Sequence, residues 1–366
     1  MLNISHKKKL RKLLRDLVNT RSDKKNPAMT AFLKKALAEN GWKNIKESGG
    51  NVWGKIGSGK IKLLYDIHSD TIPARNTGWN TEPFKAKFRN GYLYGRGAVD
   101  DKGPLAAAIF SGNFIRDSKN YSVYLLASDR EEIDEGYGCR VFLRKEKETP
   151  DFVLISEPSD LRLIFGQRGR IEITLTARGI PAHGSMPEKG KNAIFIMNEA
   201  LSALPKLKFK KIPPFTATTV TPTVIKSDGE GKNVLPLSCK VLLDIRMNHK
   251  ENVNSLIKLL KKNLPRGIEI KAGKFCPAWL LQNENFALSA KTTFAEAYRK
   301  TAVPAYWKFC TNGSSYASKG IPVIGFGPGK PEMCHKKNEN IKLSDVEKAV
   351  EFFRLLPAKT TEIIKC

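Results

Sequence analysis

Short apolar runs recur in the first half of the chain and once more near its C-terminus. Four of them are clear, at residues 61–67, 121–127, 151–155 and 322–326. They do not alternate between apolar and polar positions, as a strand with one wet face does. We therefore expect parallel strands that are buried on both faces.

Helical segments separate these runs. Residues 8–19 and 27–40 carry apolar residues every three or four positions, and residues 103–117, 137–148 and 344–356 are also helical in character. Apolar residues at that spacing share one face of an α-helix. Because strands and helices alternate, the pattern predicts an α/β sheet domain.

The pattern changes after Gly166. Alternating strands and amphipathic helices now follow in the order strand, helix, strand, strand, helix, strand, which is typical of a small split βαβ domain. Their predicted ranges are 169–179, 192–205, 216–227, 238–247, 252–263 and 267–272. We therefore predict an α/β domain made of residues 1–166 and 276–366, with an α+β domain inserted at 167–275.

Composition narrows the class of protein. The chain has 366 residues, of which 41% are hydrophobic and 27% charged, so a disordered or collagen-like chain is excluded. No apolar run approaches the ~18 residues that a membrane span needs. The N-terminal segment is basic and lacks the apolar core of a signal peptide, which predicts a cytoplasmic protein. The six cysteines form no CxxC pair, so neither a zinc knuckle nor a disulfide framework is indicated.

The chain is strongly basic, with 63 Lys and Arg against 36 Asp and Glu and a formal charge of +27. Its lysines are spread along the whole sequence, as on a solvated, lysine-rich surface. The alternative interpretation is attraction to an acidic partner, which could be a carrier protein, an acidic substrate or nucleic acid. Charge alone does not choose among these.

Acidic residues and histidines follow the apolar runs. The carboxyl ends of parallel strands meet at one edge of a sheet, where the chemistry of open α/β folds collects. Taken singly, each of these side chains could be an ordinary turn residue, but four such positions in register predict a cluster. They are His68 after the first run, Glu131 and Glu132 after the second, Glu157 after the third and His335 after the fourth, with Asp100 in a glycine-flanked turn before a predicted helix.

The residue types in this cluster point to metal ions. Crowded carboxylates repel one another unless a cation neutralises them. Two imidazoles with several carboxylates suit zinc and its neighbours, and a carboxylate shared between two ions is a common arrangement for hydrolysis. Asp70 is placed to accept the second ring N–H of His68 and so to orient that imidazole.

Several stretches together resemble the zinc-dependent acyl-amino-acid hydrolases and exopeptidases, a family that includes acetylornithine deacetylase, succinyl-diaminopimelate desuccinylase, carrier-protein-lysine hydrolase and glutamate carboxypeptidase. They run in family order from about Asp66 to Ile341. The matching stretches, which are highly specific together, are DIHSDTIPA, YGRGAVDDKGPLAAAI, SDREEIDEGYG, ISEPSD, GQRGRIEITLTARGIPAHGSMPEKGKNAI, GKNVLP, DIRM and GFGPGKPEMCHKKNENI. The resemblance implies a zinc-exopeptidase-like α/β catalytic domain, with a ferredoxin-like α+β insertion that acts as a dimerisation lid.

The resemblance also implies a ligand set for two divalent ions. Asp100 would bridge them, His68 and Glu157 would complete one site, and Glu132 and His335 would complete the other. The ions would be Zn²⁺, with Co²⁺ or Mn²⁺ as alternatives.

Catalytic roles follow from the same resemblance. Glu131 would be the general base for an attacking hydroxide and would pass the proton to the leaving amine. Asp70 would orient His68, and His183 from a partner subunit would stabilise the tetrahedral oxyanion. The family also has a cis peptide after the bridging aspartate, here Asp100–Asp101.

Substrate contacts are implied in two places. Asn233 and Arg246 match positions that bind the backbone carboxylate of the substrate, which suits the fork of an arginine. Thr311, Asn312 and Gly313 would line the pocket. Many relatives have Thr-Ser-Asp at these last positions, so the side-chain specificity stays open.

These observations favour a homodimeric two-metal amidohydrolase that deacylates a basic or diamino acid. A metallo-exopeptidase or dipeptidase with the same residues is the close alternative, and a dinuclear phosphoesterase, which usually has more histidine ligands, is a distant one. An acidic amino-group carrier protein is a possible partner. The rival from another class is a non-catalytic basic protein that binds nucleic acid or an acidic partner.

Overall fold

A computed structural model of the chain describes residues 2–74, 78–229 and 231–365. The chain forms two compact units, each with its own hydrophobic core. The first consists of Met1–Gly166, Leu280–Trp307 and Thr311–Cys366, and the second of Gln167–Trp279 and Lys308–Cys310. The second unit thus includes residues 276–279 and 308–310, which the sequence analysis assigned to the α/β domain.

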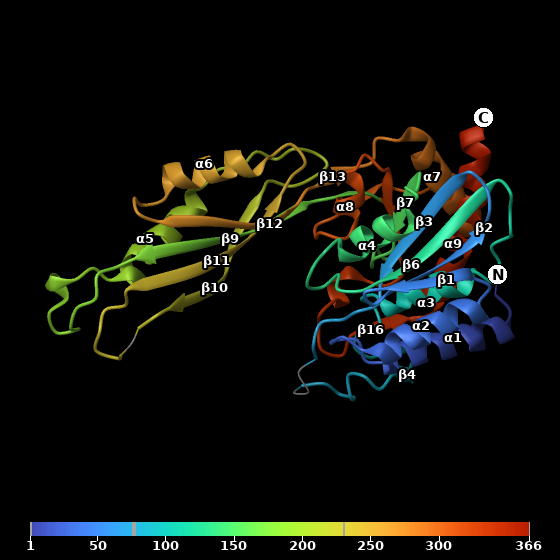
Figure 1. The fold of residues 1–366 in the computed structure, drawn as a ribbon, viewed down its shortest axis with the longest axis horizontal. Helices are drawn as coiled ribbons and strands as arrows, with labels where there is room; N and C mark the ends of the chain where they lie inside the picture. The colour runs from blue at the N-terminus through green and yellow to red at the C-terminus, as the bar shows by residue number, and fades with distance from the viewer. Residues whose placement is uncertain (1, 75–77, 230, 366) are drawn as a thin grey trace. The chain divides into compact units, whose positions relative to one another are not determined.

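The four apolar runs form the centre of a mixed sheet in the first unit (Figure 1). Strand β3 (Ile61–His68) lies parallel to β6 (Tyr121–Ser128) on one side and to β7 (Phe152–Ile155) on the other, and β7 lies parallel to β15 (Val323–Gly325). Every residue of β6 and β7 is buried, as the absence of alternation predicted. The predicted α/β class is confirmed.

The sheet extends on both sides in the order β1-β2-β6-β3-β7-β15-β8-β13, and β14 pairs with β8. A smaller sheet in the same unit has the order β16-β5-β4. The remaining strands of these two sheets are β1 (Lys43–Ser48), β2 (Asn51–Gly57), β4 (Lys87–Arg89), β5 (Tyr92–Tyr94), β8 (Ile164–Gln167), β13 (Trp279–Leu280), β14 (Ala305–Trp307) and β16 (Asn340–Lys342).

Helix α3 (Lys102–Ser111) is the central helix of the first unit. All ten of its residues are buried, and its run of three alanines lets it pack closely against α1, α9 and strand β3. The other helices of this unit are α1 (Ile4–Asn19), α2 (Pro27–Glu39), α4 (Tyr137–Glu146), α7 (Glu284–Tyr298), α8 (Gly313–Ala317), α9 (Leu343–Lys365) and the 3₁₀ helix η3 (Pro331–Met333).

Helix α9 is longer than the sequence predicted. The expected helix ended at Leu356, before Pro357, because proline lacks the N–H that bonds to the carbonyl four residues back. That carbonyl belongs to Phe353, and it accepts a hydrogen bond from the Tyr65 hydroxyl at 2.8 Å instead. The helix therefore continues to Lys365. The same bond joins α9 to the central strand β3.

The second unit has one antiparallel sheet in the order β10-β11-β9-β12. Alternate residues of β9 and β11 are buried, so one face of the sheet carries this unit's core. With two helices between the strands, the order along the chain and in the sheet is that of a ferredoxin-like fold. The elements are β9 (Gly169–Arg178), η1 (Pro187–Lys189), α5 (Ala193–Ala203), η2 (Leu204–Lys206), β10 (Thr219–Ser227), β11 (Ser238–Met247), α6 (Val253–Asn263) and β12 (Glu269–Cys276).

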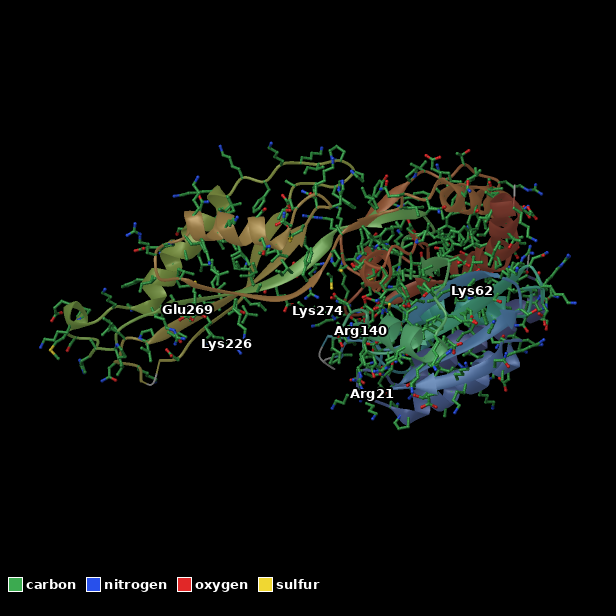
Figure 2. The ribbon with its side chains drawn as sticks, turned by 45° about the horizontal axis from the view of Figure 1, so that its top comes forward. Arg21, Lys62, Arg140, Lys226, Glu269 and Lys274 are labelled. Carbon is green, nitrogen blue, oxygen red and sulfur yellow. The ribbon has the colours of Figure 1, made fainter. Side chains whose placement is uncertain are left out.

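Basic side chains are distributed over the surfaces of both units. Figure 2 shows nitrogen-tipped side chains on each of them, for example Arg140 on the first and Lys226 on the second, and both residues are exposed. This agrees with the even spread of lysine along the sequence. Among the described residues, no helix has the length and apolar character required to cross a bilayer.

Candidate active site

Asp100 lies between the two histidines that the sequence analysis singled out. His68, the last residue of β3, places Nε2 at 2.8 Å from Asp100 Oδ1. His335, which follows η3, places Nε2 at 3.1 Å from Asp100 Oδ2. Each carboxylate oxygen of Asp100 therefore faces a different imidazole. The peptide bond between Asp100 and Asp101 is cis, as the resemblance implied.

Two glutamates complete the cluster from the neighbouring strands. Glu157 follows β7, and its Oε1 lies 3.7 Å from His68 Nε2. Glu132 follows β6, and its Oε1 lies 3.1 Å from His335 Nε2. The structure thus brings together all five predicted metal ligands. His68, Glu132 and Glu157 arrive there because β3, β6 and β7 are parallel and end at the same edge of the sheet.

Burial and like charge dominate the electrostatics of this cluster. Burial raises the pKa of Glu131 and of Glu157 well above the usual range, and the charge of Glu157 adds to the effect on Glu131. Hydrogen bonds to Asp100 and Glu132 raise the pKa of His335 to about 10. The acidic neighbours of His335 thus stabilise positive charge beside them, and the cluster as a whole favours positive charge at its centre.

Asp70 holds the loop that carries the two adjacent glutamates. Its carboxylate oxygens accept the backbone N–H of Glu131 at 3.1 Å and that of Glu132 at 3.2 Å. The Nδ1 atom of His68 lies 3.0 Å from the Asp70 main-chain oxygen and 3.5 Å from its carboxylate. The predicted acceptor for His68 is thus provided mainly by the backbone of Asp70. Its side chain positions the loop after β6, which the sequence analysis missed.

His183, Asn233 and Arg246 belong to the second unit. The Nε2 atom of His183 lies 3.2 Å from Asn233 Nδ2, so these two predicted residues are neighbours. His183 is exposed, and its Nδ1 lies 2.7 Å from the Ser185 hydroxyl. The guanidinium of Arg246, on β11, donates to the Asp244 carboxylate at 2.7 and 3.0 Å.

Thr311, Asn312 and Gly313 lie at the start of α8 in the first unit, and all three are buried. The Asn312 amide group donates to the Ser128 hydroxyl at 3.1 Å, and its oxygen accepts the backbone N–H of Gly136 at 2.5 Å. Through these two hydrogen bonds, the Asn312 side chain connects the end of β6 to the loop before α4.

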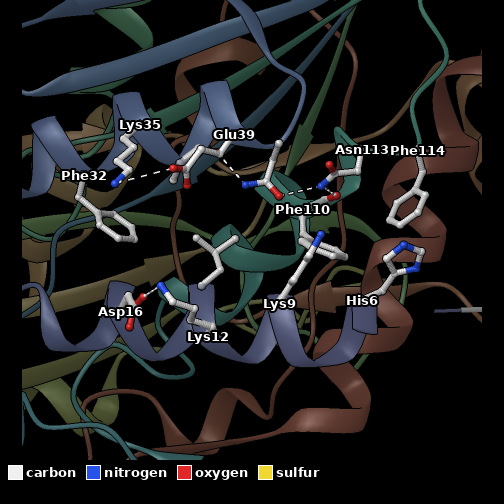
Figure 3. A pocket seen from close by; sticks show the side chains of 13 residues that line it. His6, Lys9, Lys12, Asp16, Phe32, Lys35, Glu39, Phe110, Asn113 and Phe114 are labelled. Atoms are coloured by element: carbon white, nitrogen blue, oxygen red, sulfur yellow. Dashed lines mark hydrogen bonds and ion pairs between the residues drawn. The ribbon is translucent and has the colours of Figure 1, made fainter. Parts of the chain in front are cut away.

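A separate cavity of about 600 Å³ lies between α1, α2 and the C-terminal end of α3 (Figure 3). Rings of His6, Phe110 and Phe114 gather at one end of it, with centroids 5.1 to 6.3 Å apart. None of its lining residues is a predicted site residue. The carboxylate–imidazole cluster is therefore the candidate active site on chemical grounds and not because of its cavity.

Comparison with known families gives this geometry its context. The model of the peptidase family M20/M25/M40 matches residues 64–359. The chain belongs to this family. It is therefore a metallohydrolase of the class that acts on amide bonds, and the rival hypothesis of a non-catalytic basic protein is not supported.

Several M20-family relatives span most of the chain. An Escherichia coli protein named YgeY is 29% identical over 84% of this chain and 83% of its own length. A Pyrobaculum aerophilum protein named as a LysW-lysine/LysW-ornithine hydrolase is 29% identical over 84% of this chain and 85% of its own. Other relatives are named succinyl-diaminopimelate desuccinylase and acetylornithine deacetylase.

Solved structures support the fold. The M20 metallo-carboxypeptidase Sso-CP2 from Sulfolobus solfataricus superposes with a TM-score of 0.77 over 95% of this chain and 99% of that one. At 21% sequence identity, this likeness establishes the fold alone.

The residues of the cluster fit the divalent ions of an M20 enzyme. Donor atoms of His68, Asp100 and Glu132 lie within 4.8 Å of one another, and so do those of His68, Asp101 and Glu157. The Asp101 side chain is completely buried, yet neither of its carboxylate oxygens has a hydrogen-bond partner among the described residues. Burial raises its pKa well above the usual range. A bound cation would compensate the charge of such a buried carboxylate, and the sequence analysis gave Asp101 no ligand role.

Proposed function

We propose that this chain is a two-metal amidohydrolase that removes the acyl group from an N-acyl basic or diamino acid. The observation that carries the proposal is the position of Asp100, whose two oxygens face His68 and His335 at 2.8 and 3.1 Å. Glu157 lies on the His68 side and Glu132 on the His335 side, so two donor sets share one carboxylate. The deacylase names of relatives that cover most of the chain support the acyl-amino-acid substrate.

The chemistry divides between the ions and the chain. Divalent ions, which we expect to be Zn²⁺ with Co²⁺ or Mn²⁺ as alternatives, supply Lewis-acid polarisation of the scissile carbonyl when they are bound. The Glu131 carboxylate accepts a proton from the attacking water and then delivers that proton to the leaving amine nitrogen. Asp70 fixes the Glu131 backbone, so that the base approaches the reacting atoms from a constant direction.

Residues of the second unit complete the proposed mechanism. We propose that Arg246 and Asn233 bind the substrate carboxylate. A guanidinium has five N–H donors, so the two bonds from Arg246 to Asp244 orient it and leave donors for a ligand. His183 would stabilise the oxyanion in the site of a partner subunit. The high positive charge would attract substrates with a net negative charge, such as N-succinyl-diaminopimelate.

A metallo-exopeptidase or dipeptidase is the second candidate. The match to a peptidase family favours it, and every residue of the cluster would keep the same role. The two candidates differ only in the group on the carbonyl side of the cleaved amide. Substrate preference therefore separates them.

A substrate panel with added metals tests both candidates. Purified protein would be assayed for amine release from N-acetylornithine, N-succinyl-diaminopimelate, a dipeptide ending in lysine and a lysine bound to an acidic carrier protein, each with Zn²⁺, Co²⁺ or Mn²⁺. We expect hydrolysis of an acyl amino acid, loss of activity with a chelator and its return with metal. Faster cleavage of the dipeptide would favour the exopeptidase. The proposal would be contradicted if the chelator left the rate of hydrolysis unchanged, or if no amide were cleaved with any of the metals.

Exposed apolar side chains on the second unit support the proposed homodimer. Strand β10 is an edge strand, with Val224 and Ile225 exposed on it. On helix α5, Ile194 is exposed and Phe195 is 70% exposed. An unpaired edge strand with apolar side chains is a ready surface for pairing with a second copy about a twofold axis.

Charges introduced on this surface are expected to convert the dimer to monomer. The double variant Phe195→Asp, Ile225→Lys would bury two unpaired charges in the interface, which is strongly unfavourable. Light scattering coupled to size exclusion would measure the mass at a concentration at which the unmodified protein is dimeric. Val303→Lys changes an equally exposed apolar residue of the first unit and serves as control. A monomeric unmodified protein would disprove the dimer.

A further inference from the structure

The Glu339 side chain is buried and accepts four hydrogen bonds from one short loop. Its Oε2 accepts from Arg96 Nη1 at 2.6 Å and from the Gly97 backbone N–H at 3.1 Å. Its Oε1 accepts from the backbone N–H of Val99 at 2.9 Å and of Asp100 at 3.1 Å. The exposed fraction of Glu339 is 0%, so these bonds form out of water and each unmade one would be costly. This loop is the one that carries Asp100.

The backbone around Glu339 ties the same loop to the segment that follows His335. The Gly95 N–H donates to the Glu339 carbonyl at 3.0 Å. Strand β16 begins directly after Glu339 and pairs with β5, which ends directly before Gly95. Gly97 has φ +81°, a conformation that side chains other than glycine rarely adopt. The glycine therefore gives the loop a backbone turn that other residues would resist. In this turn the backbone N–H groups of Gly97, Val99 and Asp100 all donate to the Glu339 carboxylate.

We infer that Glu339 is a positioning residue for the metal centre. It fixes the backbone of Asp100, so that the two Asp100 oxygens stay directed at His68 and His335. His335 itself lies four residues before Glu339 in the chain. Glu339 itself contacts neither histidine in this role. Its action on the ions passes through the loop, as the outer partners of metal ligands generally act. The inference rests on the proposed two-metal function.

Two properties of the contact set separate this role from ordinary core packing. All four donors come from residues 96–100, so a change at Glu339 would first disturb the loop that carries Asp100. The Arg96 side chain is also buried, lies over the ring of Trp79 at 5.2 Å and compensates the carboxylate charge. The Arg96 guanidinium is thus the charged partner of the Glu339 carboxylate, at 2.6 Å.

Metal affinity of the Glu339→Gln variant tests the inference. Glutamine keeps the shape but turns an N–H₂ group toward two of the four donors, which should loosen the loop. We expect Co²⁺ affinity, measured by competition with a coloured chelator, to fall about 10–100-fold. The visible spectrum of bound Co²⁺ should also change, whereas circular dichroism of the metal-free protein should not. Glu332→Gln changes an exposed glutamate close to His335 and should bind Co²⁺ like the unmodified protein.

Each outcome decides the question. A folded Glu339→Gln protein with unchanged Co²⁺ affinity and spectrum, and only a lower melting temperature, would overturn the inference. If that variant does not fold, Arg96→Lys replaces it, because this change keeps the carboxylate and its three backbone donors. Arg96→Lys should then weaken Co²⁺ binding by a smaller factor, and unchanged binding would refute the role. Weakened binding without hydrolysis of any substrate would instead retain the inference and reject the proposed function.

Discussion

Replacing Glu131 by glutamine is expected to lower kcat by about 10²–10⁴-fold, the range that a positioned general base contributes. The amide keeps the size of the side chain and cannot accept the proton of the attacking water. Because Glu131 is not one of the proposed metal ligands, we expect two metal ions per chain to remain, together with a nearly unchanged KM. The measurement is steady-state hydrolysis of the best substrate of the panel, with metal content determined on the same sample.

The matched control for this change is Glu332→Gln, which alters an exposed glutamate of η3, shortly before His335. It removes the same charge from the same unit and should leave kcat within about twofold, as for most surface changes. Near-normal turnover in Glu131→Gln would remove Glu131 from the mechanism. Loss of metal from that variant would instead make Glu131 a ligand.

Much of the candidate site could be predicted because it depends on local pattern and on one topological rule. The apolar runs of β3, β6 and β7 identify buried parallel strands, and such strands end at a common edge. In the register of the sheet, His68 lies opposite Ser128, three residues before Glu131. A histidine that ends one run and glutamates that follow the next are therefore brought together by the sheet itself.

Contacts between distant parts of the chain could not be predicted in this way. The end of α9 depends on Tyr65, whose hydroxyl bonds to a carbonyl 288 residues later in sequence. The support of Asp100 depends on Glu339, 239 residues away. Neither pairing leaves a periodic signal, since each joins one side chain to one backbone group. Such bonds are set by three-dimensional packing, which hydrophobic periodicity does not encode.

Asn312 and Asp70 show a related limit. The substrate contact that the resemblance implied for Asn312 stays a prediction, and the structure adds that its side chain bonds to Ser128 and Gly136. The Asp70 carboxylate accepts N–H groups from the loop after β6 rather than serving mainly His68. A motif identifies which positions matter, but the acceptor that each side chain uses depends on where neighbouring loops place their N–H groups.

The Asp100→Asn variant should have the largest effect of all, on metal content and on rate together. The two Asp100 oxygens face His68 Nε2 and His335 Nε2, and asparagine would present one oxygen and one N–H₂ group to them. An amide nitrogen is not a metal donor, so the two donor sets can no longer share this side chain. We expect at most one tightly bound ion per chain, measured by elemental analysis after dialysis.

Activity should fall by about 10³-fold or more in this variant, because a metal ion is worth several kcal/mol of transition-state stabilisation and each ~1.4 kcal/mol is tenfold in rate. Metal that binds the folded state also raises the melting temperature, and that rise should shrink in Asp100→Asn. Asp117→Asn, an exposed surface change, is the control for both readouts. Glu131→Gln should lose turnover and keep two ions, whereas Asp100→Asn should lose both. If Asp100→Asn binds two ions with normal affinity, Asp100 does not bridge a metal pair.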